Sequence, residues 1–188
     1  MTLLVASAGN TSVRLTVRRP AFRDVWDAYA EVGRMGAADV YQLVGGAVAE
    51  LYRENPAGYA NACALRMSRG FNYGGYVIPS GTIVPGRNIY RVRGSDEMAY
   101  ILRVNDLIQY VKHNWGAADL TLSSSETGNL VGRKGLIVME VSGWSDATGH
   151  VTLWDGVQSG DGTSYHDPDS GSYGGRVSLT RILYWELK

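Results

Sequence analysis

Apolar residues recur at helical spacing between residues 20 and 115, and this periodicity predicts the helices of the protein. Pro20 marks the start of the first helix, because proline is favoured in the first helical turn. The buried side of this helix carries Phe22, Val25, Trp26 and Tyr29. A second helix is predicted over residues 38–54, with apolar positions at Val40, Leu43, Val44, Ala47, Val48 and Leu51. The turn signal Asn55-Pro56-Ala57-Gly58 ends it.

Two further helices follow the same spacing. One begins near Cys63, continues through good helix formers, and ends near residues 72–75, where Asn-Tyr-Gly-Gly is a capping and turn signal. The other is predicted from Ala99 to about Trp115, with apolar positions at Ile101, Leu102, Val104, Leu107, Ile108 and Val111. Residues 76–95 between them are rich in glycine and proline, which predicts a long loop with short strand pieces.

After Trp115 the pattern changes to strands. Three are predicted, over Gly135–Val141, His150–Trp154 and Val177–Trp185, and a Gly-, Ser- and Asp-rich loop fills residues 156–175. Helices followed by strands indicate an α+β fold. Residues 1–18 are predicted to form a polar leader with a short strand at 13–17, followed by a single domain over residues 19–188.

Composition describes a globular protein without an electrostatic preference. The 188 residues are 45% hydrophobic and 19% charged, which is enough apolar material for one buried core. Eighteen basic and eighteen acidic side chains cancel to a net charge of zero. This balance gives no support for a nucleic-acid or membrane-surface partner.

The chain also lacks the signals of several other protein classes. A single cysteine excludes an internal disulfide framework and any cysteine-based metal cluster. No apolar stretch approaches the roughly 18 residues of a membrane span. The short apolar patch at residues 3–6 has no basic residue before it, so we expect no Sec-type signal peptide. Work outside the producing cell would need another delivery route.

Cys63 is the candidate nucleophile. It lies at the predicted start of a helix, where the helix dipole stabilises a thiolate. A thiolate also needs a base and a group that orients the base. His150 follows Gly149 at the start of a predicted strand and could supply the base, and the orienting acid could be Asp155, Asp161 or Asp167.

Structural roles are an alternative for each of these residues. A lone buried cysteine is often an inert small hydrophobe, and His150 could be a hydrogen-bonded residue of the sheet. His113 lies near a predicted helix end, which it would cap, and His166 lies in a loop exposed to solvent.

Four stretches of the chain form a recognisable set of motifs. The most specific stretch is Asn61-Ala62-Cys63-Ala64-Leu65-Arg66-Met67-Ser68, followed by Asn72 and Gly74. The others are Arg19-Pro20-Ala21-Phe22 with Trp26 and Tyr29; Trp115-Gly116; and Gly149-His150-Val151-Thr152-Leu153-Trp154-Asp155-Gly156 with the closing Tyr184-Trp185-Glu186-Leu187. Together they span about residues 19–188. In these four stretches the chain resembles the type VI secretion amidase effectors, specifically their fourth family.

The resemblance implies a papain-like (NlpC/P60-type) peptidase, with its nucleophile at a helix N-terminus packed on an antiparallel sheet. The implied reaction is cleavage of the D-glutamate–diaminopimelate amide bond in the stem peptide of peptidoglycan, without a metal or organic cofactor. Cys63 matches the nucleophile, His150 the general base and Asp161 the residue that orients the histidine. Ser159 and Thr163 stand where some members carry cysteines around this aspartate.

The resemblance further implies an antibacterial toxin, delivered by a component of the type VI apparatus, that acts in the periplasm of target bacteria. It also implies a cognate immunity protein, which we expect to contact the loops at 76–95 and 156–175. Two alternatives remain at this point. One is a housekeeping NlpC/P60-type wall hydrolase, which the missing Sec signal argues against. The other is a non-catalytic β-rich binding module in which Cys63 is unreactive.

Overall fold

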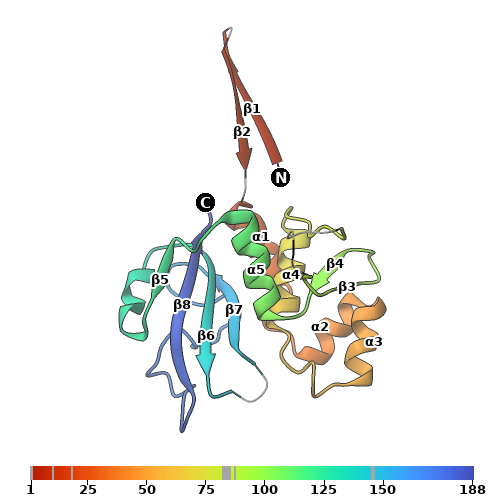
Figure 1. The fold of residues 1–188 in the computed structure, drawn as a ribbon, viewed down its shortest axis with the longest axis vertical. Helices are drawn as coiled ribbons and strands as arrows, with labels where there is room; N and C mark the ends of the chain where they lie inside the picture. Colours follow the sequence, from red (N-terminus) through yellow and green to blue (C-terminus); the bar gives the residue numbers. More distant parts are fainter. Residues whose placement is uncertain (1, 10, 18, 82–85, 87, 145–146) are drawn as a thin grey trace.

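The fold combines five α-helices with an antiparallel sheet, in the part of the chain that the structure describes (Figure 1). The computed structural model describes residues 2–9, 11–17, 19–81, 86, 88–144 and 147–188. Mixed helices and antiparallel strands agree with the predicted α+β class. None of the helices in these ranges is long and apolar enough to cross a bilayer.

The N-terminal segment forms a hairpin. Strands β1 (Thr2–Ala8) and β2 (Thr11–Val17) pair antiparallel, and β2 contains the strand predicted at 13–17. The hairpin points away from the helices and the main sheet, and its base lies near the C-terminus (Figure 1). The division into a leader of residues 1–18 and a peptidase domain of residues 19–188 stays a prediction.

The prediction of a single helix over residues 38–54 is wrong, because the structure has two helices there. After α1 (Phe22–Ala30) come α2 (Ala37–Val44) and α3 (Gly46–Glu54). Gly45 separates them with a φ of 68°, which breaks the helix. A side chain at Gly46 would lie 2.7 Å from the backbone carbon of Gly94, so this turn packs directly against another chain segment.

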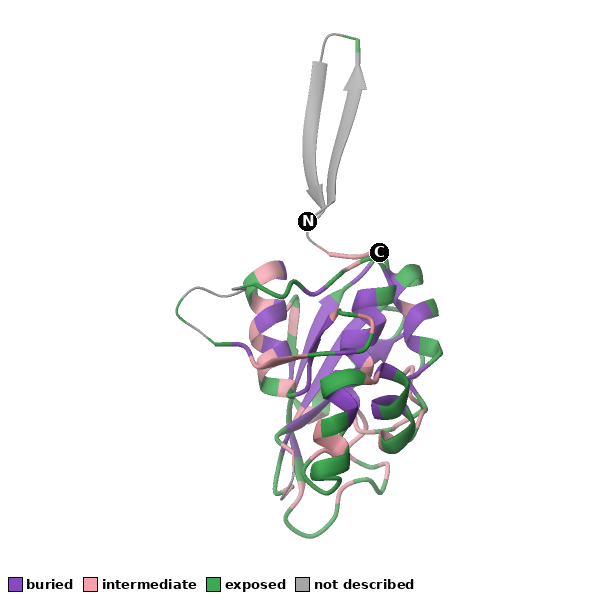
Figure 2. Cartoon of the chain, turned by 90° about the vertical axis from the view of Figure 1, so that its right-hand side faces the viewer, coloured by how far each residue is buried: buried purple, intermediate pink, exposed green. Residues whose placement is uncertain are grey.

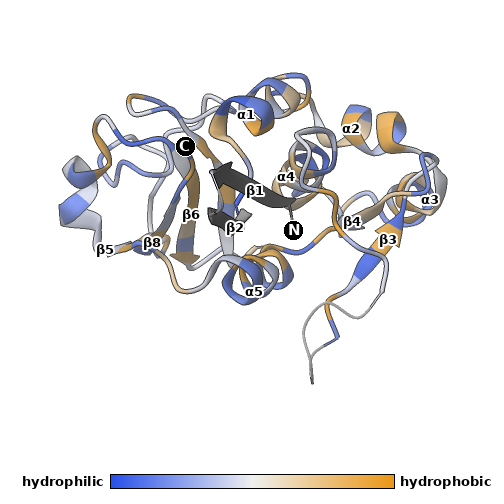
Figure 3. Ribbon diagram, turned by 90° about the horizontal axis from the view of Figure 1, so that it is seen from above, coloured by the Kyte–Doolittle hydropathy of each residue, from blue (hydrophilic) through white to orange (hydrophobic). Residues whose placement is uncertain are grey.

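Helix α4 (Cys63–Tyr73) is the central helix of the fold and lies between α1 and α5 (Figure 3). Most of its residues are buried, including the polar Ser68 and Asn72. Gly70 allows close packing of α1, because an added Cβ would lie 3.2 Å from the Cβ of Tyr29. The helix ends at Tyr73, where the sequence predicted its end.

The helix predicted from Ala99 begins instead at Val104. Residues Ala99–Ile101 form strand β4, which pairs with β3 (Arg91–Arg93), and α5 covers Val104–Trp115. Buried side chains of α4 hold β4 extended. The Ser68 hydroxyl donates to the Ile101 carbonyl and accepts from its N–H, both at 3.0 Å, and the Asn72 amide donates to the Ala99 carbonyl. These tertiary hydrogen bonds override the local helical pattern.

The main sheet has four antiparallel strands in the order β5-β8-β6-β7. Strands β6 (Gly135–Ser142), β7 (Gly149–Trp154) and β8 (Ser178–Glu186) lie close to their predicted bounds. Strand β5 (Leu120–Leu122) and the short 3-10 helix η1 (Ser124–Leu130) were not predicted. The predicted loop at 76–95 contains β3, and residues 82–85 and 87 of that loop lie outside the described ranges.

The largest core cluster lies between the helices and one face of the sheet (Figure 2). It joins Met67 and Phe71 of α4 to Val151 and Leu153 of β7. Strand β7 is an edge strand and is buried along its whole length, because helix α4 packs against it. This packing brings the start of α4 beside the start of β7.

Candidate functional site

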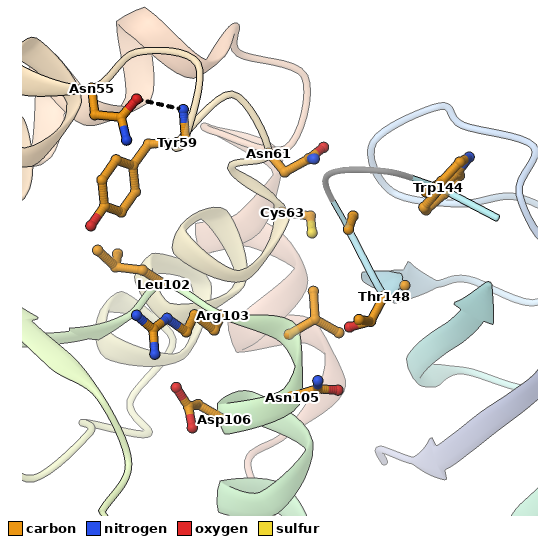
Figure 4. A pocket seen from close by; sticks show the side chains of 14 residues that line it. Asn55, Tyr59, Asn61, Cys63, Leu102, Arg103, Asn105, Asp106, Trp144 and Thr148 are labelled. Atoms are coloured by element: carbon orange, nitrogen blue, oxygen red, sulfur yellow. Dashed lines mark hydrogen bonds between the residues drawn. The ribbon is translucent and has the colours of Figure 1, made fainter. Parts of the chain in front are cut away.

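A groove of about 690 Å³ opens where the start of α4 meets two connecting segments (Figure 4). The first connection joins β4 to α5, and the second joins β6 to β7. Cys63 lines the groove although its residue is only 4% exposed, so its thiol lies at the floor. Other lining residues are Asn55, Tyr59, Asn61, Leu102, Arg103, Asn105, Asp106, Trp144 and Thr148.

The Cys63 thiol is hydrogen-bonded to His150 and to the backbone N–H of Val151. Burial alone would raise the pKa of Cys63, but these hydrogen bonds, the positive charge of His150 and that of Arg66 outweigh it. The net effect lowers the pKa of the thiol. A thiol held in this way ionises more readily than an ordinary cysteine.

His150 connects Cys63 to Asp161. Its Nε2 lies 2.6 Å from Oδ2 of Asp161, so Nδ1 is the ring atom left for the thiol. Burial lowers the pKa of His150, but the hydrogen bonds and charges of Asp161 and Cys63 raise it to about 9. Burial likewise raises the pKa of Asp161, and the histidine and Thr163 bring it below its ordinary value. The protonated imidazole is therefore stabilised on both sides.

Asp161 is itself held in place by Thr163. The Thr163 hydroxyl donates to Oδ1 of Asp161 at 2.8 Å, and the Thr163 N–H donates to the same oxygen at 3.1 Å. One carboxylate oxygen is thus fixed by Thr163 while the other accepts from His150. Ser159, on the other side of Asp161, has a buried hydroxyl without a hydrogen-bond partner among the described residues.

The other acids and histidines considered from the sequence lie elsewhere. Asp155 accepts the N–H groups of Val157 and Gln158, which makes it the turn residue after β7. Asp167 accepts the N–H of Asp169 within its own loop. His113 lies in the last turn of α5, in agreement with a capping role.

His166 is half-buried rather than solvated. Its ring packs 4.6 Å from the ring of Trp154, measured between centroids, and burial lowers its pKa. The described residues contain no group of three or more His, Cys, Asp or Glu placed to hold a metal ion.

Gly149 allows two strands to pack closely, a role that the sequence did not indicate. An added Cβ would lie 2.5 Å from the Met139 carbonyl oxygen, so a side chain here would push β7 away from β6. The glycine therefore fixes the position of the strand that carries His150.

Tyr165 was not predicted as a site residue, yet its ring packs 4.9 Å from the imidazole of His150 between centroids. Tyr165 also contacts the ring of Trp144, which lines the groove. It lies in the Gly-rich loop after β7, where no periodicity marks a residue as packed. Only an aromatic residue in an otherwise small and polar loop could have indicated it.

The chain is similar to known proteins of one family. Residues 59–185 match the family model of the type VI secretion system amidase effector protein 4. A comparison with curated protein sequences found no match. Among solved structures, the chain is similar to the effector Tae4 from Salmonella typhimurium in complex with the immunity protein Tai4 from Enterobacter cloacae. The two share 34% identity and a TM-score of 0.76, over 90% of this chain and 100% of the other.

Two further structures come from Enterobacter cloacae. The Tae4–Tai4 effector–immunity complex shares 35% identity, with a TM-score of 0.75, over 90% of this chain and 99% of that chain. The effector Tae4 alone shares 35% identity with a TM-score of 0.74, over 90% and 98%. The matched residues include Cys63 at the start of α4, His150 on β7 and Asp161 in the loop that follows β7. The chain belongs to the family of type VI secretion system amidase effector protein 4.

Proposed function

We propose that the protein is a cysteine amidase that cleaves the D-glutamate–diaminopimelate bond of peptidoglycan stem peptides, as an antibacterial toxin in the periplasm of target bacteria. The observation that carries the proposal is the hydrogen-bonded series Cys63–His150–Asp161, in which Cys63 lies at the floor of the groove. A nucleophile at a helix start, a histidine on an adjacent strand and an acid behind it are the parts of a papain-like site.

The proposed reaction has two halves. The Cys63 thiolate attacks the amide carbonyl carbon while His150 carries the proton taken from the thiol. Backbone N–H groups at the start of α4, including that of Cys63, hold the oxyanion. His150 then gives its proton to the leaving amine as the C–N bond breaks. In the second half, water attacks the thioester, His150 takes a proton from it, and the thiol is released.

Asp161 keeps the imidazole in the required orientation throughout. Its carboxylate accepts the Nε2–H of His150, so the ring presents Nδ1 to the thiol. The same contact stabilises the imidazolium that forms when Cys63 ionises. The groups that this scheme uses are water, the three side chains and the backbone N–H groups at the start of α4.

Incubation with purified muropeptides tests the proposed bond. We expect each stem peptide to gain one water and separate between D-glutamate and diaminopimelate, because the thioester forms on the glutamate side chain. Mass spectrometry of the products identifies the cut. Cleavage between other residues, or release of intact stem peptides from the sugar, would contradict the proposed specificity.

We expect Thr163→Val to lower kcat/KM by about 10-fold, because Asp161 loses a hydrogen bond to a charged oxygen. Thr163→Ser keeps the hydroxyl and should restore most of the activity. Ser159→Ala is the matched control, since this neighbouring hydroxyl has no hydrogen-bond partner among the described residues. Steady-state kinetics of the three variants measures this. Equal losses in all three would remove Thr163 from the site.

We also propose a cognate immunity protein and a type VI delivery component as partners. The immunity protein is supported by the similar effectors, whose structures are complexes with Tai4. Its proposed contacts are the loops at 76–95 and 156–175. The family match to a secreted effector argues against a housekeeping wall hydrolase. The hydrogen bonds from His150 and Val151, which lower the pKa of the Cys63 thiol, argue against a binding module with an inert cysteine.

A further inference from the structure

Arg103 is the one positively charged side chain among the described residues that line the groove. It lies between β4 and α5, and its side chain is exposed. In Figure 4 Arg103 lies with Tyr59 and Leu102 on one side of Cys63, and Trp144 lies on the other. The only other charged lining residue described is Asp106. Positive charge is therefore confined to one wall of the groove.

The guanidinium of Arg103 is oriented by aromatic contacts. Its central carbon lies 4.6 Å from the centroid of the Tyr90 ring, a cation–π contact. Tyr90 in turn hydrogen-bonds Tyr59, and the Arg103 charge acts on the Tyr59 hydroxyl, whose pKa is raised mainly by burial. The side chain is therefore held beside the groove at a low cost in conformational entropy on binding.

The donors of Arg103 are not used by an internal acid among the described residues. The ion pairs of these residues do not include Arg103, whereas Arg19, Arg69 and Arg93 each have a carboxylate partner. Arg103 also makes no side-chain hydrogen bond to another residue of the described ranges, and the contact with Tyr90 engages the face of the guanidinium. Its N–H fork can therefore meet a ligand in the plane of the group.

We propose that Arg103 binds a carboxylate of the stem peptide next to the bond that is cut, and so contributes to substrate specificity. This inference rests on the proposed function. Guanidinium and carboxylate match as a two-point, charge-assisted pair. A glutamate linked through its side chain keeps a free α-carboxylate close to the scissile carbonyl. Diaminopimelate carries carboxylates on the opposite side of the bond, and both sources share the same chemistry.

Peptides that differ in one charge distinguish the two sources. Each peptide is prepared in three forms: with free carboxylates, with the glutamate α-carboxylate amidated, and with the side-chain carboxylate of diaminopimelate amidated. For the wild-type protein, one amidation should raise KM by about 10- to 100-fold, the usual range for a charged hydrogen bond. Arg103→Gln should raise KM for the free peptide by a similar factor. In the Arg103→Gln protein, the amidation that raised KM of the wild-type protein should then have no further effect on KM.

Three variants support this comparison. Arg103→Lys keeps the charge without the planar fork and should lie between wild type and Arg103→Gln. Tyr90→Leu removes the ring beneath the guanidinium and should raise KM by less than Arg103→Gln does. Arg93→Gln is the matched control. Arg93, on β3, is exposed and paired with Glu97, so its replacement should leave KM unchanged.

A binding measurement separates recognition from catalysis. Calorimetry on the Cys63→Ala protein, with and without Arg103→Gln, should show the same 10- to 100-fold loss of affinity for the free peptide. If Arg103→Gln weakens all three peptides equally, or none, Arg103 does not bind a carboxylate. If the wild-type protein cleaves none of the peptides, the proposed function fails instead.

Discussion

Cys63→Ala should abolish hydrolysis of muropeptides, with kcat reduced by at least about 10⁴-fold. The thiolate forms the covalent bond in the proposed scheme, and the neighbouring His150 cannot replace it because it serves as the base. Mass spectrometry of digests over long incubations sets the limit of detection. Residual activity within about 10-fold of wild type would remove Cys63 as the nucleophile.

A loss of activity must be separated from a loss of fold. Cys63→Ala removes one buried sulfur and should cost about 1 kcal/mol of unfolding free energy. Ser68→Ala is the matched control on the same helix, because it loses the hydrogen bonds to Ile101 and should cost about 1–2 kcal/mol. Thermal unfolding measures both. We expect the Ser68 variant to keep its kcat well below its melting temperature, whereas the Cys63 variant is inactive at every temperature.

His150→Ala should lower kcat/KM by about 10²- to 10⁴-fold and should also make Cys63 less reactive. Burial raises the thiol pKa, and the hydrogen bond and charge of His150 oppose it. Without the imidazole, burial dominates and the pKa of Cys63 rises. The rate of alkylation by iodoacetamide, followed from pH 5 to 10, should therefore fall at neutral pH and its midpoint should move upward.

The pH dependence of the wild-type protein has a definite sign. The pKa of His150 is raised to about 9, so the imidazolium is present at neutral pH and is lost as pH rises through about 9. Activity should fall over the same range, because the leaving amine then lacks a proton donor. His113→Ala is the control, since His113 lies in the last turn of α5 away from the groove.

The alkylation experiment can also contradict the scheme. If the alkylation of Cys63 is unchanged in the His150→Ala variant, Cys63 and His150 do not form an ion pair.

The main sheet shows which elements a local sequence pattern can predict. Strands β6, β7 and β8 were predicted within one or two residues, because each consists of a run of apolar and β-branched side chains. The three-residue β5 was missed, since it is too short for a periodic signal. The α4 helix was predicted at both ends for the same local reason, from its helix formers and its glycine turn.

Two helix predictions failed where distant segments intervene. The break at Gly45 is stabilised by Ser95, whose N–H and hydroxyl both donate to the Val44 carbonyl at the end of α2. Strand β4 is held by Ser68 and Asn72 from α4. In both places the apolar spacing is helical, and hydrogen bonds from elsewhere in the chain decide the backbone conformation.

The candidate site divides in the same way. Cys63 at a helix start and His150 after a glycine were recognisable from sequence, because each lies at the boundary of a periodic element. Periodicity could not choose among Asp155, Asp161 and Asp167, which share one irregular loop. The tertiary structure places Asp161 alone of these against His150 and fixes it with Thr163.

The sequence by itself determined the α+β class, the family resemblance and the lone thiol at a helix start. The resemblance favoured Asp161 as the acid, but only the tertiary structure shows that its carboxylate meets the histidine and that Arg103 lines the groove beside Cys63. The physical reason is the range of the forces involved. Helix and strand formation depend on neighbours within a few residues, whereas the series Cys63–His150–Asp161 depends on the packing of α4 against the edge strand β7.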